Sequence, residues 1–225
     1  MLLFIAAEPW EFAGLLPRCR NVRKFKALAS WARSAELNGT GILMVTNGAG
    51  PKHAAAAVDA ARQAADIHAV VSTGFCGALD PALGIASIVV ADAVNANPVA
   101  TPHSKRAYHT GALVSINHIA CTAAEKRKLR GSGASAVEME AAGVAERAQE
   151  HRLPLYCVRA VTDLADETFA FDLNRALRED GHFATMQILT SAFCHPGLLP
   201  ELLRLRRRSV LAARALGEFL ADCRF

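Results

Sequence analysis

The stretch Ala136-Val137-Glu138-Met139-Glu140-Ala141-Ala142-Gly143 is the most informative part of this chain. It places two carboxylates on either side of a methionine, at the point where an apolar run turns into a helical pattern. Further along, Val158-Arg159-Ala160-Val161-Thr162-Asp163 has the pattern of a buried strand that ends in an acid. Upstream, Thr73-Gly74-Phe75-Cys76-Gly77-Ala78 continues another apolar strand into a glycine-containing turn. Acids and glycines at strand ends, alternating with helices, are typical of α/β proteins.

The same alternation of short apolar runs and longer helical patterns extends along all 225 residues. It predicts an α/β chain around a mainly parallel or mixed sheet, organised as a single domain over residues 1–225. Beyond the stretches quoted above, strands are predicted over 2–7, 41–46, 69–73, 86–94 and 112–116. Helices are predicted over 52–65, 122–130, 139–150, 174–192 and 199–220, and the polar segment 97–109 is expected to be a loop.

The composition argues against several classes of protein. Hydrophobic residues make up 52% of the chain, which is enough for a continuous core, and the net charge of +4 is too small to indicate nucleic-acid binding. The six cysteines form no CxxC pair and have no histidine spacing suited to zinc, so no metal site is predicted. The apolar segment 1–7 is too short to span a membrane and has no basic region, so a cytoplasmic protein is expected.

From the pattern alone, the acids have ordinary structural interpretations. Glu138 and Glu140 stand two residues apart, so they cannot share one helical face, and both would stabilise the N-terminus of the following helix. Asp163 would serve as a helix cap or pair with Arg159. Its position at a strand end is nevertheless where α/β proteins bind ligands.

Taken together, these stretches resemble the purine and uridine phosphorylase superfamily, which includes the methylthioadenosine nucleosidases. The family's Glu-Met-Glu motif is matched intact by residues 138–140, and the resemblance extends over nearly the whole chain. It implies a three-layer α/β/α nucleoside phosphorylase fold with a central mixed sheet. It also implies an enzyme that breaks the bond between a ribose and a base, without a metal or organic cofactor. A homo-oligomer is expected, because subunit interfaces commonly complete active sites in this superfamily.

The resemblance assigns roles to the same acids. Glu140 would hold the two cis hydroxyls of the ribose, Met139 would pack on the face of the sugar, and Glu138 belongs to the same substrate site. The segment 159–166 resembles the adenine-specific nucleosidase motif, in which the acid at Asp163 donates a proton to purine N7. Donation near neutral pH requires a pKa raised by apolar surroundings.

An acid after the first strand would activate the attacking water in the nucleosidase branch. Counting from the strand gives this position to Glu11, with Glu8 as the second choice. The ordinary alternative is a solvated glutamate in a first helical turn.

The same resemblance favours hydrolysis over phosphorolysis. Phosphorylases carry an arginine and a hydroxyl residue where this chain has Ser72 and Phe75, and their Gly-Asp-Pro-Leu-Arg element is absent after the first strand. A phosphorylase that uses inorganic phosphate stays open as the alternative, because Arg18 or Arg20 could supply the positive charge. Backbone N–H groups of glycine turns also bind phosphate or water, and the residues in question here are Gly48, Gly50 and Thr73.

Base recognition is expected in segment 117–120, which follows a predicted strand. There Ile119 would form an apolar platform for the purine, whose edge is read partly through the backbone, and His118 lies next to it. Phe75 and Gly74 complete the predicted substrate pocket.

The tail from His195 to Ser209, together with segment 122–127, resembles the hopanoid-associated phosphorylase-like proteins. This implies adenine removal from adenosylhopane and weak peripheral contact with membranes. The ordinary interpretation of helix 199–220 is a core helix with a basic solvent-exposed face. The alternative from another functional class is a catalytically weak module that binds a nucleoside or a lipid.

Overall fold

The computed structural model describes residues 1–182 and 196–225. Its centre is formed by parallel strands, with β1 lying between β4 and β5, and β10 pairing with the other side of β5. The bounds of these four strands are β1 (Leu2–Ala6), β4 (Thr40–Thr46), β5 (Ala69–Ala78) and β10 (Leu155–Asp163). Parallel strands bring their carboxyl ends to one edge of the sheet, which prepares a site there.

Beyond β5 the sheet closes on itself. β10 also pairs antiparallel with β6, β6 pairs parallel with β8, β8 pairs parallel with β9, and β9 returns antiparallel to β5. The additional strands of this ring are β6 (Ile88–Val94), β8 (His109–Ser115) and β9 (Ala136–Glu138). The ring places the Glu-Met-Glu stretch at the end of β9, which pairs with β5.

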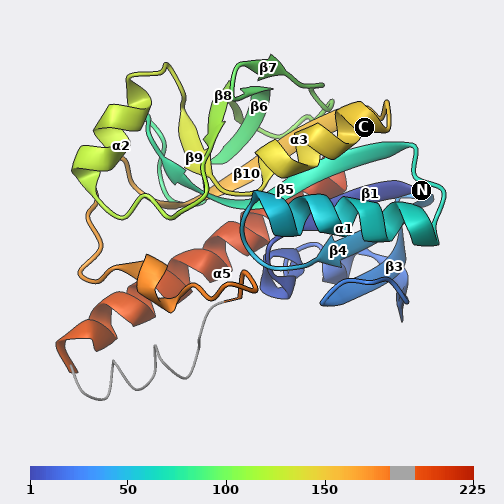
Figure 1. Ribbon diagram of the computed structural model, residues 1–225, viewed down its shortest axis with the longest axis horizontal. Coiled ribbons are helices and arrows are strands. Elements are labelled where there is room, and N and C mark those ends of the chain that lie inside the picture. Colours follow the sequence, from blue (N-terminus) through green and yellow to red (C-terminus); the bar gives the residue numbers. More distant parts are fainter. Residues whose placement is uncertain (183–195) are drawn as a thin grey trace.

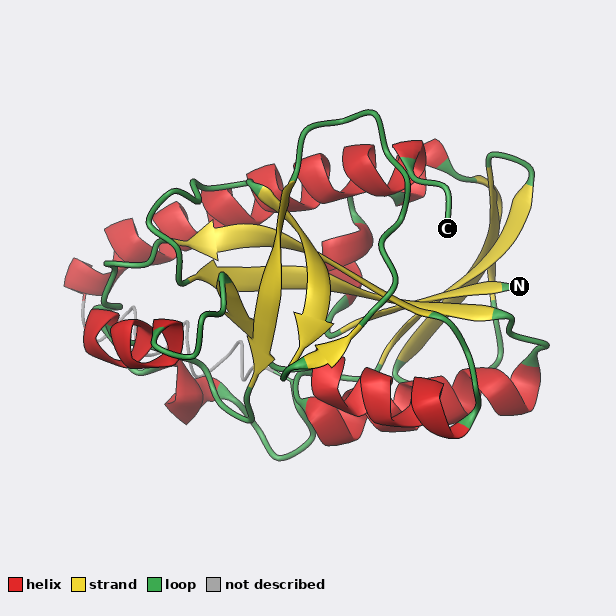
Figure 2. Cartoon of the chain, turned by 90° about the horizontal axis from the view of Figure 1, so that it is seen from above, coloured by secondary structure: helices red, strands yellow, loops and turns green. Residues whose placement is uncertain are grey.

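Helices cover both faces of the sheet (Figures 1 and 2). On one face, α1 (Pro51–Ala64) and α3 (Ala141–Glu150) share a core with β1, β4 and β5. On the other, the long C-terminal helix α5 (Leu199–Asp222) packs its alanine, leucine and phenylalanine side chains on the opposite side of the same strands. α2 (Ala123–Arg130) lies near β9 at the end of the sheet. This is the three-layer arrangement around a mixed sheet that the sequence predicts.

An antiparallel extension at the sheet edge was not predicted. It consists of β2 (Arg20–Lys24) and β3 (Trp31–Leu37), with β3 pairing with β4. β2 is exposed along its whole length and carries three basic side chains, so it lacks the apolar alternation that marks a half-buried strand. A two-residue strand, β7 (Asn97–Pro98), also interrupts the expected loop 97–109.

The predicted helix 174–192 is wrong over its first part. Residues Leu173–Ala176 form the single 3-10 turn η3, and the chain then runs without a helix to residue 182; residues 183–192 of the prediction lie outside the described part. Asp172 caps the turn, and Gly181 has a left-handed φ of 76°. The carbonyl of Gly181 accepts from Ala49 N at 2.7 Å, which ties this segment to the β4–α1 loop, and Gly181 N donates to the carbonyl of Arg178 at 3.0 Å in a turn.

Candidate active site

A cavity of about 290 Å³ lies at the carboxyl ends of β1, β5 and β10. Its walls include eight of the residues that the sequence singles out: Glu11, Phe75, His118, Ile119, Glu138, Met139, Glu140 and Asp163. They come from β5, from the ends of β9 and β10, and from the segments after β1, β8 and β9, which meet only in the folded chain. The parallel topology therefore assembles most of the predicted site.

Four predicted residues do not line the cavity but lie behind it. Gly50 N donates to Glu140 Oε1 at 3.1 Å, and Gly48 N donates to the carbonyl of Ala7 at 3.0 Å. Thr73 is buried, and its hydroxyl has no hydrogen-bond partner among the described residues. Gly74 lies beneath Glu11. In the β4–α1 loop it is Ala49, between the two predicted glycines, that reaches the cavity wall.

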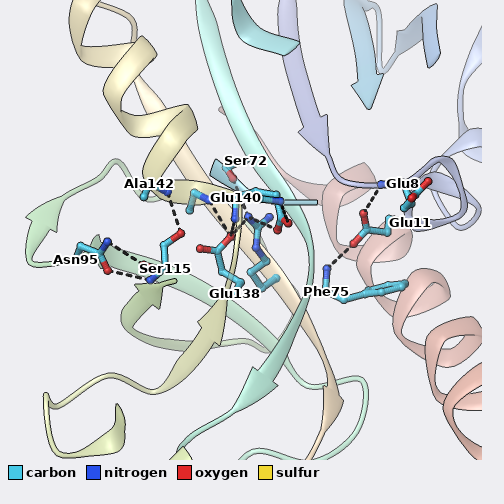
Figure 3. A network of polar contacts seen from close by, with 12 residues as sticks. Glu8, Glu11, Ser72, Phe75, Asn95, Ser115, Glu138, Glu140 and Ala142 are labelled. Carbon is cyan, nitrogen blue, oxygen red and sulfur yellow. Dashed lines mark hydrogen bonds and ion pairs between the residues drawn. The ribbon is translucent and has the colours of Figure 1, made fainter. Parts of the chain in front are cut away.

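Glu11 is fixed in the wall by two backbone amides. It lies in the 3-10 turn η1 (Pro9–Phe12), and its carboxylate accepts from Phe75 N at 2.8 Å and from Glu8 N at 2.9 Å (Figure 3). It is 6% exposed, so it is not the solvated residue of a first helical turn. Burial raises its pKa, although both backbone hydrogen bonds act in the opposite direction.

Glu138 binds the helix that follows it and a buried arginine. Its Oε2 accepts from Glu140 N at 2.9 Å and from Ala141 N at 2.8 Å, so it satisfies the first amides of α3. The same oxygen pairs with Arg159, whose Nη2 also donates to Ser72 Oγ at 2.8 Å. Arg159 therefore pairs with Glu138, and the ordinary alternative in which Asp163 pairs with Arg159 is not realised. Glu138 lines the cavity as a buried acceptor whose Oε2 is already bonded within the protein.

Glu140 turns toward the cavity from the N-cap of α3. Besides the hydrogen bond from Gly50, its nearest charged neighbour is Arg159, with Nη2 at 3.9 Å from Oε2. Burial and the negative charge of Glu138 raise the pKa of Glu140 to about 8. Met139 packs beside it in a small apolar cluster with Ala7 and Ala49.

Asp163 ends β10 at an irregularity in the ladder. The register with β5 shifts between Val161 and Asp163, so the consecutive residues Thr162 and Asp163 both reach the cavity. Asp163 Oδ1 accepts from Thr162 Oγ1 at 3.0 Å, and Oδ2 accepts from Lys126 Nζ at 2.5 Å. Burial raises the pKa of Asp163, and the neighbouring ammonium opposes that rise. Sequence reasoning missed Lys126, which stands in a run of basic residues with nothing to single it out.

Ile119, the predicted base platform, lines the cavity, and its backbone is bonded by another side chain. The Asn174 amide accepts from Ile119 N at 2.8 Å and donates to Ile119 O at 3.0 Å. The backbone N–H and carbonyl of Ile119 are therefore already bonded. A purine that is recognised through these groups has to displace the Asn174 amide. His118 is half-exposed, and its Nε2 lies 2.5 Å from Glu125 Oε1, as is typical of a surface histidine.

Side chains from distant segments complete the walls. Those that sequence reasoning did not place there are Trp10, Phe169, Leu173 and Ser209. Leu205 of the helix expected over 199–220 also lines the cavity. Leu205 and Ser209 stand four apart on α5, so they share one face of that helix.

No lysine or arginine lines the cavity within the described residues. Arg18 donates to the carbonyl of Gly14 and pairs with Glu218, and Arg20 is exposed on β2, so neither fills the role of a phosphate contact here.

Across residues 1–182 and 196–225, no group of three or more histidine, cysteine, aspartate or glutamate side chains is arranged to hold a metal ion. In the same ranges, no helix is long and apolar enough to cross a membrane.

Comparisons with known proteins agree with this fold. The sequence matches the family model of the phosphorylase superfamily over residues 3–112 and 96–190. A search of curated proteins gives no match. Among solved structures, the 5′-methylthioadenosine/S-adenosylhomocysteine nucleosidase of Streptococcus pneumoniae with a transition-state inhibitor is similar, with a TM-score of 0.73 at 17% identity, covering 98% of this chain and 96% of that one.

Two further structures have the same fold. The nucleosidase of the same type from Neisseria meningitidis, in complex with methylthio-immucillin-A, has a TM-score of 0.70 at 20% identity, covering 98% of this chain and 96% of that chain. A mutant futalosine hydrolase of Helicobacter pylori has a TM-score of 0.72 at 15% identity, with the same coverage of 98% and 96%. The family match, which spans most of the sequence, confirms the resemblance that the motifs indicate. The chain therefore belongs to the phosphorylase superfamily, and it is an enzyme that cleaves an N-glycosyl bond.

Proposed function

We propose that this enzyme hydrolyses the N-ribosidic bond of a purine nucleoside with an adenine-type base. The observation that carries the proposal is the convergence of three buried acids, Glu11, Glu140 and Asp163, on one cavity. Burial raises the pKa of Glu11 and of Asp163, which is the property that acid–base chemistry near neutral pH requires.

The three acids divide the reaction between them. Asp163 gives its proton to N7 of the purine as the bond between C1′ and the base nitrogen breaks, so the electron pair of that bond leaves on a neutral base. Glu11 accepts a proton from the water that attacks C1′. Glu140 accepts hydrogen bonds from the ribose hydroxyls, and Met139 packs against the sugar.

The strand β5 supports this division of roles. Glu11 is bonded at Phe75, whereas Asp163 pairs in register with Gly77, two residues further along. Two residues of a strand span about 7 Å. The proposed base and the proposed acid thus flank a space in which the C1′–nitrogen bond of a nucleoside fits.

Water as the nucleophile is supported by the cavity wall. Within the described part of the chain the wall contains no lysine or arginine. Phe75 has no polar side-chain group, and Ser72 is buried away from the cavity, where its hydroxyl accepts from Arg159. A phosphate ion would enter a pocket already lined by carboxylates, at an electrostatic cost. Hydrolysis therefore fits this site better than phosphorolysis.

We further propose a bulky apolar 5′ group on the substrate, as in adenosylhopane. This rests on the resemblance of the tail and of segment 122–127 to hopanoid-associated proteins, and on the apolar wall formed by Trp10, Phe169 and Leu205. His195, the first residue of that tail, lies outside the described residues.

Weak membrane contact through α5 and a homo-oligomeric state belong to the same proposal. Leu199 and Leu203 are exposed on α5, as are Arg206 and Arg207. Arg204 and Arg208 pair with Glu167, so they face the protein and contribute less to such a contact than the sequence alone suggests.

Product analysis tests the hydrolysis proposal directly. The purified protein is incubated with adenosine, methylthioadenosine or adenosylhopane in buffer with and without phosphate. Release of adenine with a free sugar in both buffers is the expected result. A strict requirement for phosphate, with a ribose 1-phosphate product, would identify a phosphorylase instead, and binding without release of adenine would identify a binding module.

A further inference from the structure

A buried lysine lies directly behind the Asp163 carboxyl group. Lys126 on α2 has a side chain that is 0% exposed, whereas the adjacent Arg127 and Lys128 of the same helix are exposed. Its Nζ donates to Asp163 Oδ2 at 2.5 Å and to the carbonyl of Leu164 at 2.7 Å. Burying an ammonium group is costly unless it is paired and hydrogen-bonded. The fold therefore buries Lys126, alone among these three basic residues, in contact with Asp163.

The surroundings of the lysine keep it in place. Nζ lies 5.4 Å from the centre of the Phe169 ring, within the range of a cation–π contact. Phe169 itself lines the cavity, and its N–H donates to the carbonyl of Cys121 at 3.0 Å. The lysine head is thus enclosed between the end of β10 and an aromatic wall of the cavity.

The other charged and titratable groups near Asp163 come from β5, from the segment after β10 and from α5. Glu167 after β10 raises the pKa of Asp163 through its negative charge. The thiol of Cys76 in β5 is also close, but burial raises its pKa, so it brings no charge to Asp163. Glu167 is itself neutralised by Arg204 and Arg208 of α5, each at 2.6 Å. Lys126 is consequently the cation in direct contact with the Asp163 carboxyl.

We propose that Lys126 is a positioning residue for Asp163, which holds the carboxyl at the cavity and stabilises the carboxylate left behind when its proton goes to the leaving base. This inference rests on the proposed function of Asp163 as proton donor. Lys126 does not line the cavity, so it acts through Asp163 and not on the substrate.

The proton balance is as follows. Asp163 starts as the acid beside the Lys126 ammonium, and its O–H proton moves to the purine while the C1′–nitrogen electron pair goes to the base. An Asp163 carboxylate then remains, paired with Lys126, and the proton from the attacking water goes to Glu11. Solvent restores the proton to Asp163 and takes the one from Glu11 between turnovers. An ion pair is created by the donation, so the lysine makes Asp163 a stronger acid.

Neutral replacements of the lysine separate this role from a purely structural one. Lys126→Met removes the positive charge, and Lys126→Gln removes it while keeping a group that hydrogen-bonds. An opposite charge in contact lowers a carboxyl pKa by about 1–3 units. In the dependence of kcat on pH, the fall in rate on the alkaline side (the alkaline limb) is therefore expected to occur about 1–3 pH units higher in both variants. Plateau kcat is expected to fall about tenfold, a part of the roughly 10²–10⁴-fold that general acid catalysis supplies.

Two controls are available on the same helix. Lys128→Met removes an exposed charge and is expected to leave the profile unchanged. Lys126→Arg keeps the charge and is expected to keep the alkaline limb near that of the natural enzyme. A lysine that only stabilises the fold would lower the melting temperature in both neutral variants without moving the limb.

A second measurement works without any substrate. Carbon-13 NMR of aspartate-labelled protein reports the Asp163 carboxyl directly, with its signal identified by its loss in Asp163→Asn. A higher Asp163 pKa in Lys126→Met than in the natural protein supports the proposal, and an unchanged pKa together with an unchanged alkaline limb overturns it. If the natural protein releases no adenine, the proposed function itself is refuted. This outcome differs from that of an active enzyme whose pH profile is the same with and without Lys126.

Discussion

Gly74 and Glu11 approach each other so closely that the glycine has no room for a side chain. A Cβ atom on Gly74 would lie 2.5 Å from Glu11 Oε1, and the glycine backbone has a φ of +134°. Glu11 in turn accepts the N–H of the next residue, Phe75. Because Gly74 has no side chain, it leaves room for the Glu11 carboxylate, which we propose as the general base.

Gly74→Ala is expected to displace Glu11 and to lower turnover of a nucleoside by at least tenfold. The unfavourable backbone conformation alone costs about 1–3 kcal/mol of folding stability. Gly39→Ala is the matched control, because Gly39 also has a positive φ of 82° but a Cβ there meets nothing within 4 Å. Steady-state kinetics and thermal unfolding of both variants check this. Equal turnover in the two variants would show that the contact with Glu11 is unimportant.

Asp163→Asn is expected to remove most turnover on adenine nucleosides while leaving ligand binding largely intact. Asparagine keeps the size of the side chain at the end of β10 but has no acidic proton for the base, and general acid catalysis contributes roughly 10²–10⁴-fold. Single-turnover kinetics and calorimetric binding of adenine separate the two effects. Natural kcat in this variant would remove the proton-donor role.

Glu140→Gln is expected to impair ribosides far more than 2′-deoxyribosides, because the carboxylate serves the pair of hydroxyls. A hydrogen bond to a charged group contributes about 1.5–3 kcal/mol, which is roughly a 10- to 150-fold change in kcat/KM. Comparing adenosine with 2′-deoxyadenosine checks this. The same loss on both sugars would point to a structural Glu140, whose carboxylate only binds Gly50.

The same variant has a pH-dependent effect on stability. Burial raises the pKa of Glu140 from 4.5 to about 8. The folded state therefore binds the proton more tightly than the unfolded state. The contribution of Glu140 to stability is full below about pH 4.5, is lost as the pH rises from about 4.5 to 8, and stays constant above that. Glu140→Gln mimics the protonated acid, so its melting temperature should rise relative to the natural protein between pH 5 and pH 9. A difference that is constant across this range would contradict the raised pKa.

Glu11→Gln is expected to slow hydrolysis sharply and to abolish the acid limb of the pH profile. A general base must be ionised, so the rate of the natural enzyme should fall as the pH drops through the Glu11 pKa, which burial places above 4.5. Glu8→Gln is the control, because Glu8 is the second acid of the same turn and lies 2.9 Å from His182 Nδ1. If Glu8→Gln lost the acid limb and Glu11→Gln kept it, the two assignments would be exchanged.

Adenosylhopane is expected to be a better substrate than methylthioadenosine, and the protein is expected to sediment weakly with anionic liposomes. Each arginine near an anionic surface contributes about 1 kcal/mol, and added salt weakens that attraction. Replacing both Arg206 and Arg207 with glutamine should abolish sedimentation without changing turnover of methylthioadenosine, since neither lines the cavity. A preference for methylthioadenosine and no sedimentation at low salt would reduce the protein to a small-nucleoside enzyme.

Local patterns in the sequence determined the strands, the first helix and the positions of the acids. Apolar runs such as 69–73 and 158–161 predict buried strands, and parallel strands bring whatever follows them to one edge of the sheet. This pattern places Glu11, Glu140 and Asp163 near strand ends, and the resemblance to the phosphorylase superfamily supplied the roles expected of them. Their burial follows from the same geometry.

Only the tertiary structure decided which partners these acids have. Lys126 is one basic residue among several in its helix, and the fold alone sends it to Asp163, 37 positions away in the sequence. Asn174 binds the backbone of Ile119 across 55 positions, and α5 brings Leu205 and Ser209 to the cavity from the far end of the chain. Such contacts leave no periodic trace in the sequence, because they depend on how separate elements pack and not on the repeat within any one of them.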